Sequence, residues 1–441
     1  MAESAGIPAV GVVCPGFMPS AMTTSEAAGL KGARFVEFPG SNIAVQSRED
    51  VRQNAEILVD EIIKSLTIEI KAEDIFKGEE SDPQRIVFTG DYAEVNQYLY
   101  DGNMTDGLPI VPPTQELVQE FLKYTNRSPD EVIGVLPPEG RKATPWIVAV
   151  NGAIAGCRPE YMPLLTAIAE AVSDPRYSIG HSGSTAGWSP MIIVNGPIIK
   201  KLDFRSETAV TRPGKMANTT IGRFLRLLMI NVARFLPGTT DKATYGLNYF
   251  VAIAEAEHLS PWEPLSVTLG FKPGQSVVTV NSALCVSYNF ITFGSAKDHL
   301  ESIAEEATRA ISQDPVILTF GPERRHILVL SPLVASILAD GGYSKRDIQQ
   351  YLFENTGIQA RLFDRLLQRT WPEQTACNLV REGRLPEAFS RSEDPERIVP
   401  LMLSPDEFMI LVAGDPARNR SFIALQVGDQ GLATSKAIVS I

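Results

Sequence analysis

The sequence predicts an α/β protein in which an incomplete doubly wound segment is followed by a larger mixed α/β (or α+β) domain. Two observations carry this expectation. Residues 1–70 alternate short apolar runs with amphipathic stretches at the spacing of a strand–helix–strand–helix unit. Beyond them, apolar runs suited to buried strands alternate with helical patterns as far as the C-terminus.

The N-terminal elements follow from local patterns. We expect two strands and two helices, with strands over 7–13 and 33–38 and helices over 20–30 and from 47 or 50 to 66. Ser47 can cap the second helix, with Asp50 at its third position as a capping-box variant. A unit with so few strands cannot bury its own core, so the sequence indicates that half of the unit is missing.

Residues 71–85 are charged and turn-rich and are typical of a linker, and residues 86–441 are expected to form a large substrate-binding domain. In that domain strands are expected over 147–150, 191–194, 249–254, 277–280, 316–320, 327–330, 408–412 and 422–427. Helices are expected over 114–124, 159–172, 219–233, 298–312 and 345–356. The sequence GPERRH, residues 321–326, predicts a turn with solvated charges.

Composition narrows the class of protein. The 441 residues include 40 basic and 52 acidic side chains, and the net charge of −12 argues against nucleic acid as a partner. No apolar stretch reaches the ~18 residues of a membrane span, and the N-terminus lacks the pattern of a secretory signal. The four cysteines are far apart in the sequence: Cys14, Cys157, Cys285 and Cys377. This spacing indicates reduced thiols, so we expect a soluble cytoplasmic protein.

Several stretches resemble a known family. GIPAVGVVCPGF and RFVEFPGSNIAVQSREDVRQNAEILVDEIIKSLT resemble the closing half of the UGSC-type (seleno)protein domain, and the layout is similar to component B of the glycine reductase type. Four further stretches resemble the large domain that is fused behind UGSC domains: DGLPIVPPT (106–114), AVNGAIAGCRPEYMP (149–163), VNGP (194–197) and AEHLSPWEPL (256–265).

One motif of that family is absent. In the family an earlier strand ends in Cys- or Sec-Gly-Ser-Cys, which supplies the reactive chalcogen, and this sequence contains no Cys-Gly-Ser-Cys. The resemblance therefore implies a small partner subunit that carries the motif and completes the site. Loss of that half by truncation is the other explanation, although Met1 favours a natural start.

Two cysteines are candidate catalytic residues. Cys14 lies just past the first expected strand, where ligand sites of open α/β sheets gather, and could resolve an oxidised partner cysteine. Cys157 and Asn151 flank a small-residue junction between an expected strand and helix, which suits a nucleophile and an anion contact. For both cysteines the alternative is an inert buried thiol.

Three further candidates lie on loops or strand ends. Asp106, in a proline-rich loop, could act as a base, or the loop could be a turn capped by Thr114. His181, in the glycine- and serine-rich run 179–190, could transfer protons, or that run could be a plain hydrophilic loop. Asn195 follows the next strand and brings a polar group to the same sheet edge.

Two more groups complete the candidate site. An anion site is expected where basic and hydroxyl side chains precede an apolar helix, with Thr219 or Thr220 as the N-cap. The members of this site are Lys215, Asn218, Thr219 and Arg223. The alternative is simple capping of the helix with solvated cations. Glu255 and Glu257 share a face of an expected strand. Together with His258, ahead of Trp262, they could supply an acid/base pair or a metal site, or the carboxylates could be merely exposed. Zinc would need more His or Cys ligands, so no metal is expected.

Together these patterns predict the large subunit of a heteromeric thiol-dependent enzyme. The partner's cysteine or selenocysteine would attack or reduce an electrophilic carbon or sulfur in a small molecule, by reductive or lyase-type C–S or C–N cleavage, on analogy with the glycine-reductase layout. No cofactor is identified, and an external thiol is the candidate reductant. The alternatives are a non-catalytic scaffold for the partner and a self-sufficient hydrolase that uses Cys157.

Overall fold

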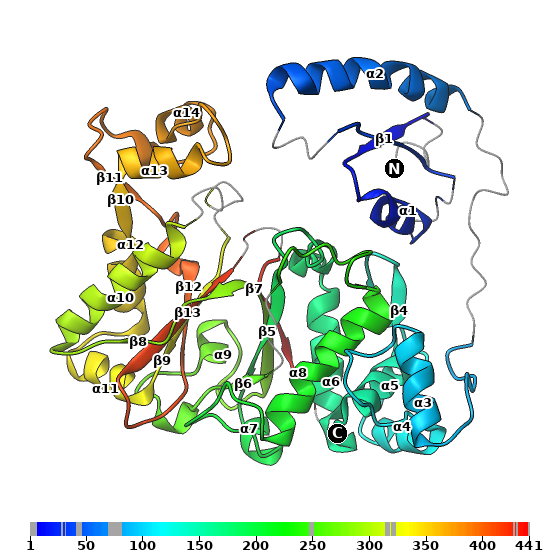
Figure 1. Ribbon diagram of the computed structural model, residues 1–441. Coiled ribbons are helices and arrows are strands. Elements are labelled where there is room, and N and C mark those ends of the chain that lie inside the picture. The colour runs from blue at the N-terminus through cyan, green and yellow to red at the C-terminus, as the bar shows by residue number, and fades with distance from the viewer. Residues whose placement is uncertain are drawn as a thin grey trace.

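The computed structural model describes residues 7–27, 30, 32–40, 46–68, 82–246, 251–313, 318, 323–426, 428 and 431–439. It has the expected α/β class, with helices packed around an eight-stranded mixed sheet and a separate small N-terminal unit (Figure 1). Most of the expected linker 71–85 and of the expected strand 316–320 lies outside the described residues. None of the described helices is both long and apolar enough to cross a membrane.

The N-terminal unit contains the expected elements: β1 (Val10–Val13), α1 (Met18–Ala27), β2 (Arg34–Glu37) and α2 (Arg48–Thr67). β1 and β2 pair in parallel as a two-stranded sheet of their own. The capping box of Ser47 and Asp50 at the start of α2 is confirmed. The buried core of this unit consists of Val36, Phe38 and Leu58, which is small for an independently stable fold.

The large domain is built on a sheet of strand order β12-β9-β13-β7-β5-β6, with β14 beside β7 and β8 beside β13. Its strands are β5 (Ser189–Asn195), β6 (Ile253–Ala254), β7 (Val277–Val286), β8 (Phe290–Ile291), β9 (His326–Leu330), β12 (Phe408–Val412), β13 (Arg420–Gln426) and β14 (Thr434–Ala437). The pairs β5–β6 and β12–β9 are parallel, and β7 and β13 are antiparallel to their neighbours. The sheet curves until its edge strands approach, where the N–H of Ala256 donates to the carbonyl of Val412 over 2.8 Å.

Alternation along the strands divides the core into an inner and an outer part. Inward-facing residues fill the concave side of the sheet: Met191, Ile193, Ile253, Ile327, Val329, Met409, Leu411, Phe422 and Ala424. Helices α5 (Pro145–Ala155), α6 (Met162–Ser173) and α8 (Met216–Leu228) pack on the outer face at one end. Helices α10 (Ala296–Ile311), α11 (Pro332–Asp340) and α12 (Lys345–Asn355) pack on it at the other end (Figure 1).

Shorter elements complete the domain: α3 (Tyr92–Asp101), α4 (Gln115–Leu122), β3 (Gly134–Leu136), β4 (Arg141–Ala143), α7 (Ile198–Lys201), α9 (Leu265–Thr268), β10 (Gly357–Gln359), α13 (Ala360–Leu367), α14 (Ala376–Arg381) and β11 (Ile398–Pro400).

One expected strand and one expected helix start are wrong. Residues 147–150 lie inside α5 and form no strand, because the hydroxyl of Thr144 caps the helix at the N–H of Ile147 and a short apolar run cannot by itself distinguish a strand from a buried helix. Helix α8 begins at Met216, so neither expected threonine is its N-cap. The hydroxyl of Thr219 accepts from the N–H of Gly214, and that of Thr220 donates to the carbonyl of Met216.

The expectation of solvated charges over 321–326 is wrong for Arg324 and His326, which are both buried. The Arg324 guanidinium donates to the Glu407 carboxylate over 2.6 Å, and both side chains are 0% exposed. His326 Nδ1 accepts from the N–H of Gln426 over 3.0 Å. Burial, together with the charge of Arg324, lowers the pKa of His326 well below its ordinary value, so the imidazole is neutral. Strand β9 begins at His326 and carries its side chain into the core, and Arg324 is buried two residues before the strand.

Candidate functional site

A cavity of about 580 Å³ lies in the large domain next to the N-terminal unit. We call it the N-terminal pocket. It is lined by Asn103, Thr105, Asp106, Gly107, Ser182, Gly187, Trp188, Ser189, Pro190, Gly222, Leu225, Arg226, Met229, Ile230, Leu236, Pro237, Gly238, Asp241, Ala243, Tyr245 and Gly246. The Ser20 hydroxyl donates to the carbonyl of Thr239 over 2.8 Å, and the Lys242 ammonium lies 6.0 Å from the centre of the Phe17 ring. Because Thr239 and Lys242 belong to the loop that lines the cavity, these contacts place the N-terminal unit beside it.

Cys14 directly follows β1 at the carboxyl edge of the small parallel sheet, as expected. Its carbonyl accepts from the N–H of Phe17 over 3.1 Å, so the thiol belongs to the turn that meets the pocket loop. The next glycine, Gly16, donates to the Glu37 carboxylate at the end of β2 over 3.1 Å. The Cys14 side chain is half-buried. Its catalytic role stays a prediction.

Asp106 and Arg223 form a two-pronged ion pair. Arg223 Nε lies 2.9 Å from Asp106 Oδ2, and Nη2 lies 2.8 Å from Oδ1. Nη2 also donates to the carbonyl of Pro109 over 2.9 Å, so the pair anchors the proline-rich loop to α8. The anion that Arg223 binds is therefore a side chain of the same protein. Asp106 lines the N-terminal pocket, but both of its oxygens are engaged.

The loop 179–190 lines the N-terminal pocket, although not through its histidine. His181 is exposed and is not among the lining residues. Ser182 and Trp188 line the pocket instead, and the Ser182 hydroxyl donates to the carbonyl of Trp188 over 3.1 Å. Arg226 also lines the pocket, although no local sequence signal marks it, and its guanidinium lies 3.5 Å from the Asp241 carboxylate on the pocket wall.

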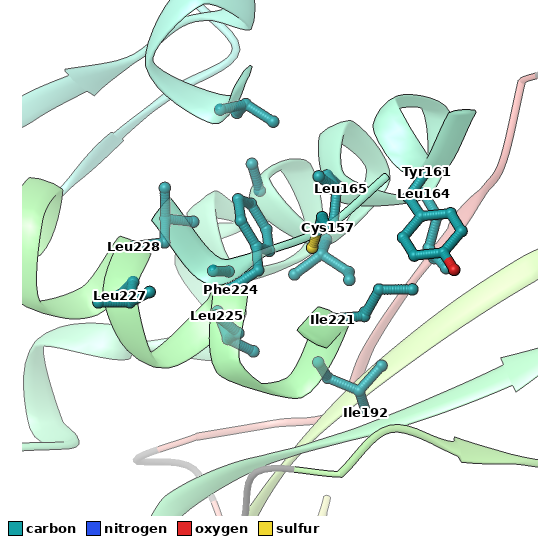
Figure 2. Close-up of a cluster of buried hydrophobic side chains, with 14 of the residues drawn as sticks. Cys157, Tyr161, Leu164, Leu165, Ile192, Ile221, Phe224, Leu225, Leu227 and Leu228 are labelled. Atoms are coloured by element: carbon teal, nitrogen blue, oxygen red, sulfur yellow. The ribbon is translucent and has the colours of Figure 1, made fainter. Parts of the chain in front are cut away.

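Cys157 and Asn151 belong to the hydrophobic core, and neither lies at a strand edge. Cys157 is 8% exposed and packs in the cluster that includes Leu165 and Phe224 (Figure 2). Burial raises the pKa of its thiol to about 12, in spite of a hydrogen bond with Thr220. Asn151 lies inside α5, where its Nδ2 donates to the carbonyl of Ile147 over 2.9 Å. These contacts are those of a structural thiol and a structural amide.

Cys157 is expected to resist alkylation in the folded protein. A pKa near 12, against an ordinary value of 9.0, lowers the thiolate fraction at pH 8 by about a thousandfold. Iodoacetamide labelling followed by peptide mass spectrometry should therefore modify the half-buried Cys14 and leave Cys157 unmodified until denaturant is added. Rapid native labelling of Cys157 would contradict this burial.

The residues expected to form an anion site at the start of α8 are engaged with the protein itself. Lys215 Nζ lies 2.5 Å from the Asp203 carboxylate at the surface. Asn218 is buried, with its oxygen accepting from the N–H of Arg205 and its amide donating to the carbonyl of Ala252, each over 2.8 Å. Asn218 therefore links the loop at Arg205 to the residue before β6, and none of these side chains is left open for an anion.

Glu255 is the centre of a buried polar cluster at the carboxyl ends of β5 and β6. Its oxygens accept from Asn195 Nδ2 over 2.6 Å, from the N–H of Leu265 over 2.8 Å and from the N–H of Val412 over 3.3 Å. The same Asn195 amide donates to Glu257 over 3.0 Å. The expectation that Glu255 and Glu257 share a strand face is wrong, because β6 ends at residue 254. The Asn195 amide bridges the two carboxylates instead, and their role as an acid/base pair stays a prediction.

Lys345 completes this cluster and was missed from the sequence. Its Nζ lies 3.7 Å from Glu255 Oε1, and its side chain is 9% exposed. Burial raises the pKa of Glu255 and lowers that of Lys345, while each charge counteracts the shift of the other. A lysine at the first position of a capped helix is typical of an exposed residue, so no local signal marked it. Trp262 donates through Nε1 to the carbonyl of Tyr343 over 3.0 Å, beside the same cluster.

His258 does not join this cluster. Its ring lies 3.2 Å from the Glu207 carboxylate, and both side chains are largely exposed. Among the described residues, no group of three or more His, Cys, Asp or Glu side chains is arranged to hold a metal ion.

These features define an α/β protein in which a two-stranded unit is docked beside a cavity of a larger, curved-sheet domain. Residues 1–68 match the model of the UGSC family, and this match supports membership of that family through the N-terminal unit. The match does not reach the large domain. No curated protein matches the chain, and no solved structure matches it.

Proposed function

We propose that the chain is the large subunit of a heteromeric, cytoplasmic, thiol-dependent enzyme that acts on a small molecule. The observation that carries the proposal is the two-stranded parallel sheet at the rim of the N-terminal pocket. Parallel sheets are normally covered on both faces and contain more than two strands. A unit of this size beside a cavity is suited to completion by another polypeptide.

The surface of the N-terminal unit supports a missing neighbour. Val12 on β1 is 49% exposed, and α2 exposes Ile57 and Ile63 by 64% and 55%. Added strands and a helix would bury such residues. In the UGSC resemblance the chalcogen motif ends an earlier strand. In a completed parallel sheet the motif would therefore lie at the carboxyl edge, where Cys14 lies and which adjoins the pocket.

The proposed chemistry rests on analogy with the glycine-reductase layout. The partner's thiolate or selenolate attacks an electrophilic carbon or sulfur of the substrate, and the leaving group departs with the bonding electron pair. In a reductive reaction the Cys14 thiolate then attacks the partner's chalcogen, and the bond between that chalcogen and the substrate carbon breaks. The released carbon keeps the electron pair of this bond and takes up a proton. Two equivalents of an external thiol reduce the resulting bond between Cys14 and the partner, and are themselves oxidised to a disulfide. The large domain holds the substrate in the N-terminal pocket, with Ser182 and Arg226 as polar contacts.

A non-catalytic scaffold is the second candidate, because the polar groups that suggested chemistry within this chain are engaged in its structure. Asp106 is paired with Arg223, and Cys157 is a core thiol. The buried Cys157 gives no support to a self-sufficient hydrolase. The scaffold and the enzyme differ at Arg226: Arg226→Met should leave turnover by the assembled pair unchanged if the chain is a scaffold, and should lower it if the chain binds substrate.

Native mass spectrometry of the protein purified untagged from its own host tests the proposal directly. We expect a complex with a small polypeptide that carries Cys- or Sec-Gly-Ser-Cys. A homo-oligomer of this chain, with no companion and no additional N-terminal sequence, would rule out a split site.

A matched pair of surface variants tests where the partner binds. Val12→Lys places a charge on the exposed face of β1 and should abolish co-purification of the partner, because an unpaired charge would be buried in the completed unit. Val135→Lys on β3 is the control, since Val135 is also 49% exposed and belongs to the large domain. Retention of the partner by both variants would contradict docking on β1.

A further inference from the structure

A second cavity, of about 700 Å³, lies between the start of α12, the start of β12 and residues 262–269. We call it the Lys345 cavity. It is lined by Trp262, Glu263, Leu265, Thr268, Leu269, Arg325, Ser344, Lys345, Arg346, Gln349, Asp406, Phe408, Met409 and Ile410. None of these residues lines the N-terminal pocket. A cavity of this volume accommodates a small organic molecule.

The feature that points to a ligand is the Lys345 ammonium. Its Nζ is buried and has no hydrogen-bond partner in the described part of the chain, since the Glu255 oxygen at 3.7 Å is beyond hydrogen-bond distance. Glu255 is itself held by the amide of Asn195 and two backbone N–H groups. Glu255 therefore balances the charge of Lys345 without using its donors. Buried donors are nearly always satisfied, so an acceptor is expected beside the Lys345 ammonium, and Lys345 lines the cavity.

The charges around the cavity are mixed: Arg325, Lys345 and Arg346 line it together with Glu263 and Asp406, and the carboxylates of Glu255 and Glu257 also act on Lys345. Arg325 lines the same cavity, one residue before β9. Arg346 also lines it, but its guanidinium is paired with Asp406 at the surface. The remaining carboxylate of the lining, Glu263, is exposed. Lys345 lies in the first turn of an eleven-residue helix, whose N-terminal dipole also favours negative charge.

Apart from the charged side chains and the polar Thr268, Ser344 and Gln349, the lining is apolar. Trp262 is partly buried, and Leu265, Phe408 and Met409 are buried in the wall. A ligand that fills the cavity must therefore combine an anionic group with an apolar body.

We propose that the Lys345 cavity binds a small organic acid, whose carboxylate is bound by Lys345 and Arg325 and whose apolar body packs against Trp262 and Phe408. This inference concerns the chain alone and holds whether or not a partner completes the N-terminal unit.

Isothermal titration of the full-length protein with three probes tests the proposal. Phenylacetate carries both features, phenylacetamide lacks the charge, and sulfate lacks the apolar body. We expect phenylacetate to bind about tenfold or more tightly than either of the others, because a charge-assisted hydrogen bond is lost in one case and the apolar contact in the other. Lys345→Met should weaken phenylacetate binding by about tenfold or more. The control Lys200→Met, at an exposed lysine on α7, should leave it unchanged.

Removal of Lys345 alone leaves Glu255 without its counter-charge, so the double variant Lys345→Met, Glu255→Gln provides a second measurement in a charge-balanced background. It should also lose phenylacetate affinity while its circular dichroism spectrum matches that of the wild type. Equal binding of phenylacetate and phenylacetamide, failure of all three probes to bind the wild type, or wild-type affinity in the folded Lys345→Met protein would each overturn the proposal.

Discussion

Replacement of Arg324 by Met is expected to lower the free energy of unfolding by about 3–5 kcal/mol, because it leaves the Glu407 carboxylate buried without its counter-charge. Both side chains are 0% exposed, and the two groups are joined by a 2.6 Å hydrogen bond. Burial raises the pKa of Glu407, and the positive charge of Arg324 counteracts that rise. Urea unfolding followed by tryptophan fluorescence measures the loss.

Arg346→Met is the matched control for this variant. Arg346 pairs with Asp406, but the two side chains are 58% and 57% exposed, so we expect a change of about 0–1 kcal/mol. The double variant Arg324→Met, Glu407→Gln should be more stable than the single one, since it removes the unpaired charge and keeps an acceptor for the N–H groups of Leu403 and Ser404. A loss below about 1 kcal/mol in the single variant would show that the pair contributes little to stability.

The second large effect is expected at Asp106. Asp106→Ala should lower the free energy of unfolding by about 3 kcal/mol, because both hydrogen bonds to Arg223 are lost and that guanidinium stays mostly buried. The two side chains are 4% and 16% exposed. The proline-rich loop should also be released from α8, which faster proteolytic cleavage between residues 104 and 110 would report.

The control for Asp106→Ala is Asp406→Ala, because Asp406 pairs with an arginine at the surface. That change should be within about 1 kcal/mol of the wild type and leave the cleavage pattern unaltered. Equal stability of both variants would mean that the Asp106–Arg223 pair does not anchor the loop. The effect on stability also makes Asp106 a poor probe of catalysis, since a loss of activity could follow from loop release alone. Arg226 is the better probe of the N-terminal pocket, because its ion pair with Asp241 is longer, at 3.5 Å.

Several elements could be predicted from the sequence because their signals are local. The capping box of Ser47 and Asp50 marks the start of α2, and Thr114 caps α4 as expected. The apolar run 408–412 coincides with β12. The run 147–150 was misassigned because four apolar residues carry no distinguishing period, whereas the decisive cap lies at Thr144, outside the run.

The candidate site was less predictable, since it depends on groups that are distant in sequence. Asn195 was expected at a strand end and Glu255 on a strand face, and the parallel pairing of β5 with β6 brings the two side chains together. Lys345 could not be found in this way, because it lies on a helix across the domain and its own neighbourhood is that of an exposed helix start. Cys157 was a reasonable nucleophile by spacing, and its burial became visible only from the packing of α8 against α5.

By itself, the sequence determined the strand–helix–strand–helix order of the N-terminal unit and its shortage of strands. Both follow from hydrophobic period and capping within short windows. The tertiary structure decided which charges are buried and what they pair with: Arg324 with Glu407, Asp106 with Arg223, and Lys345 with Glu255. The physical reason is that a buried charge is stable only beside a partner, and the fold, not the local sequence, selects that partner from distant positions along the chain.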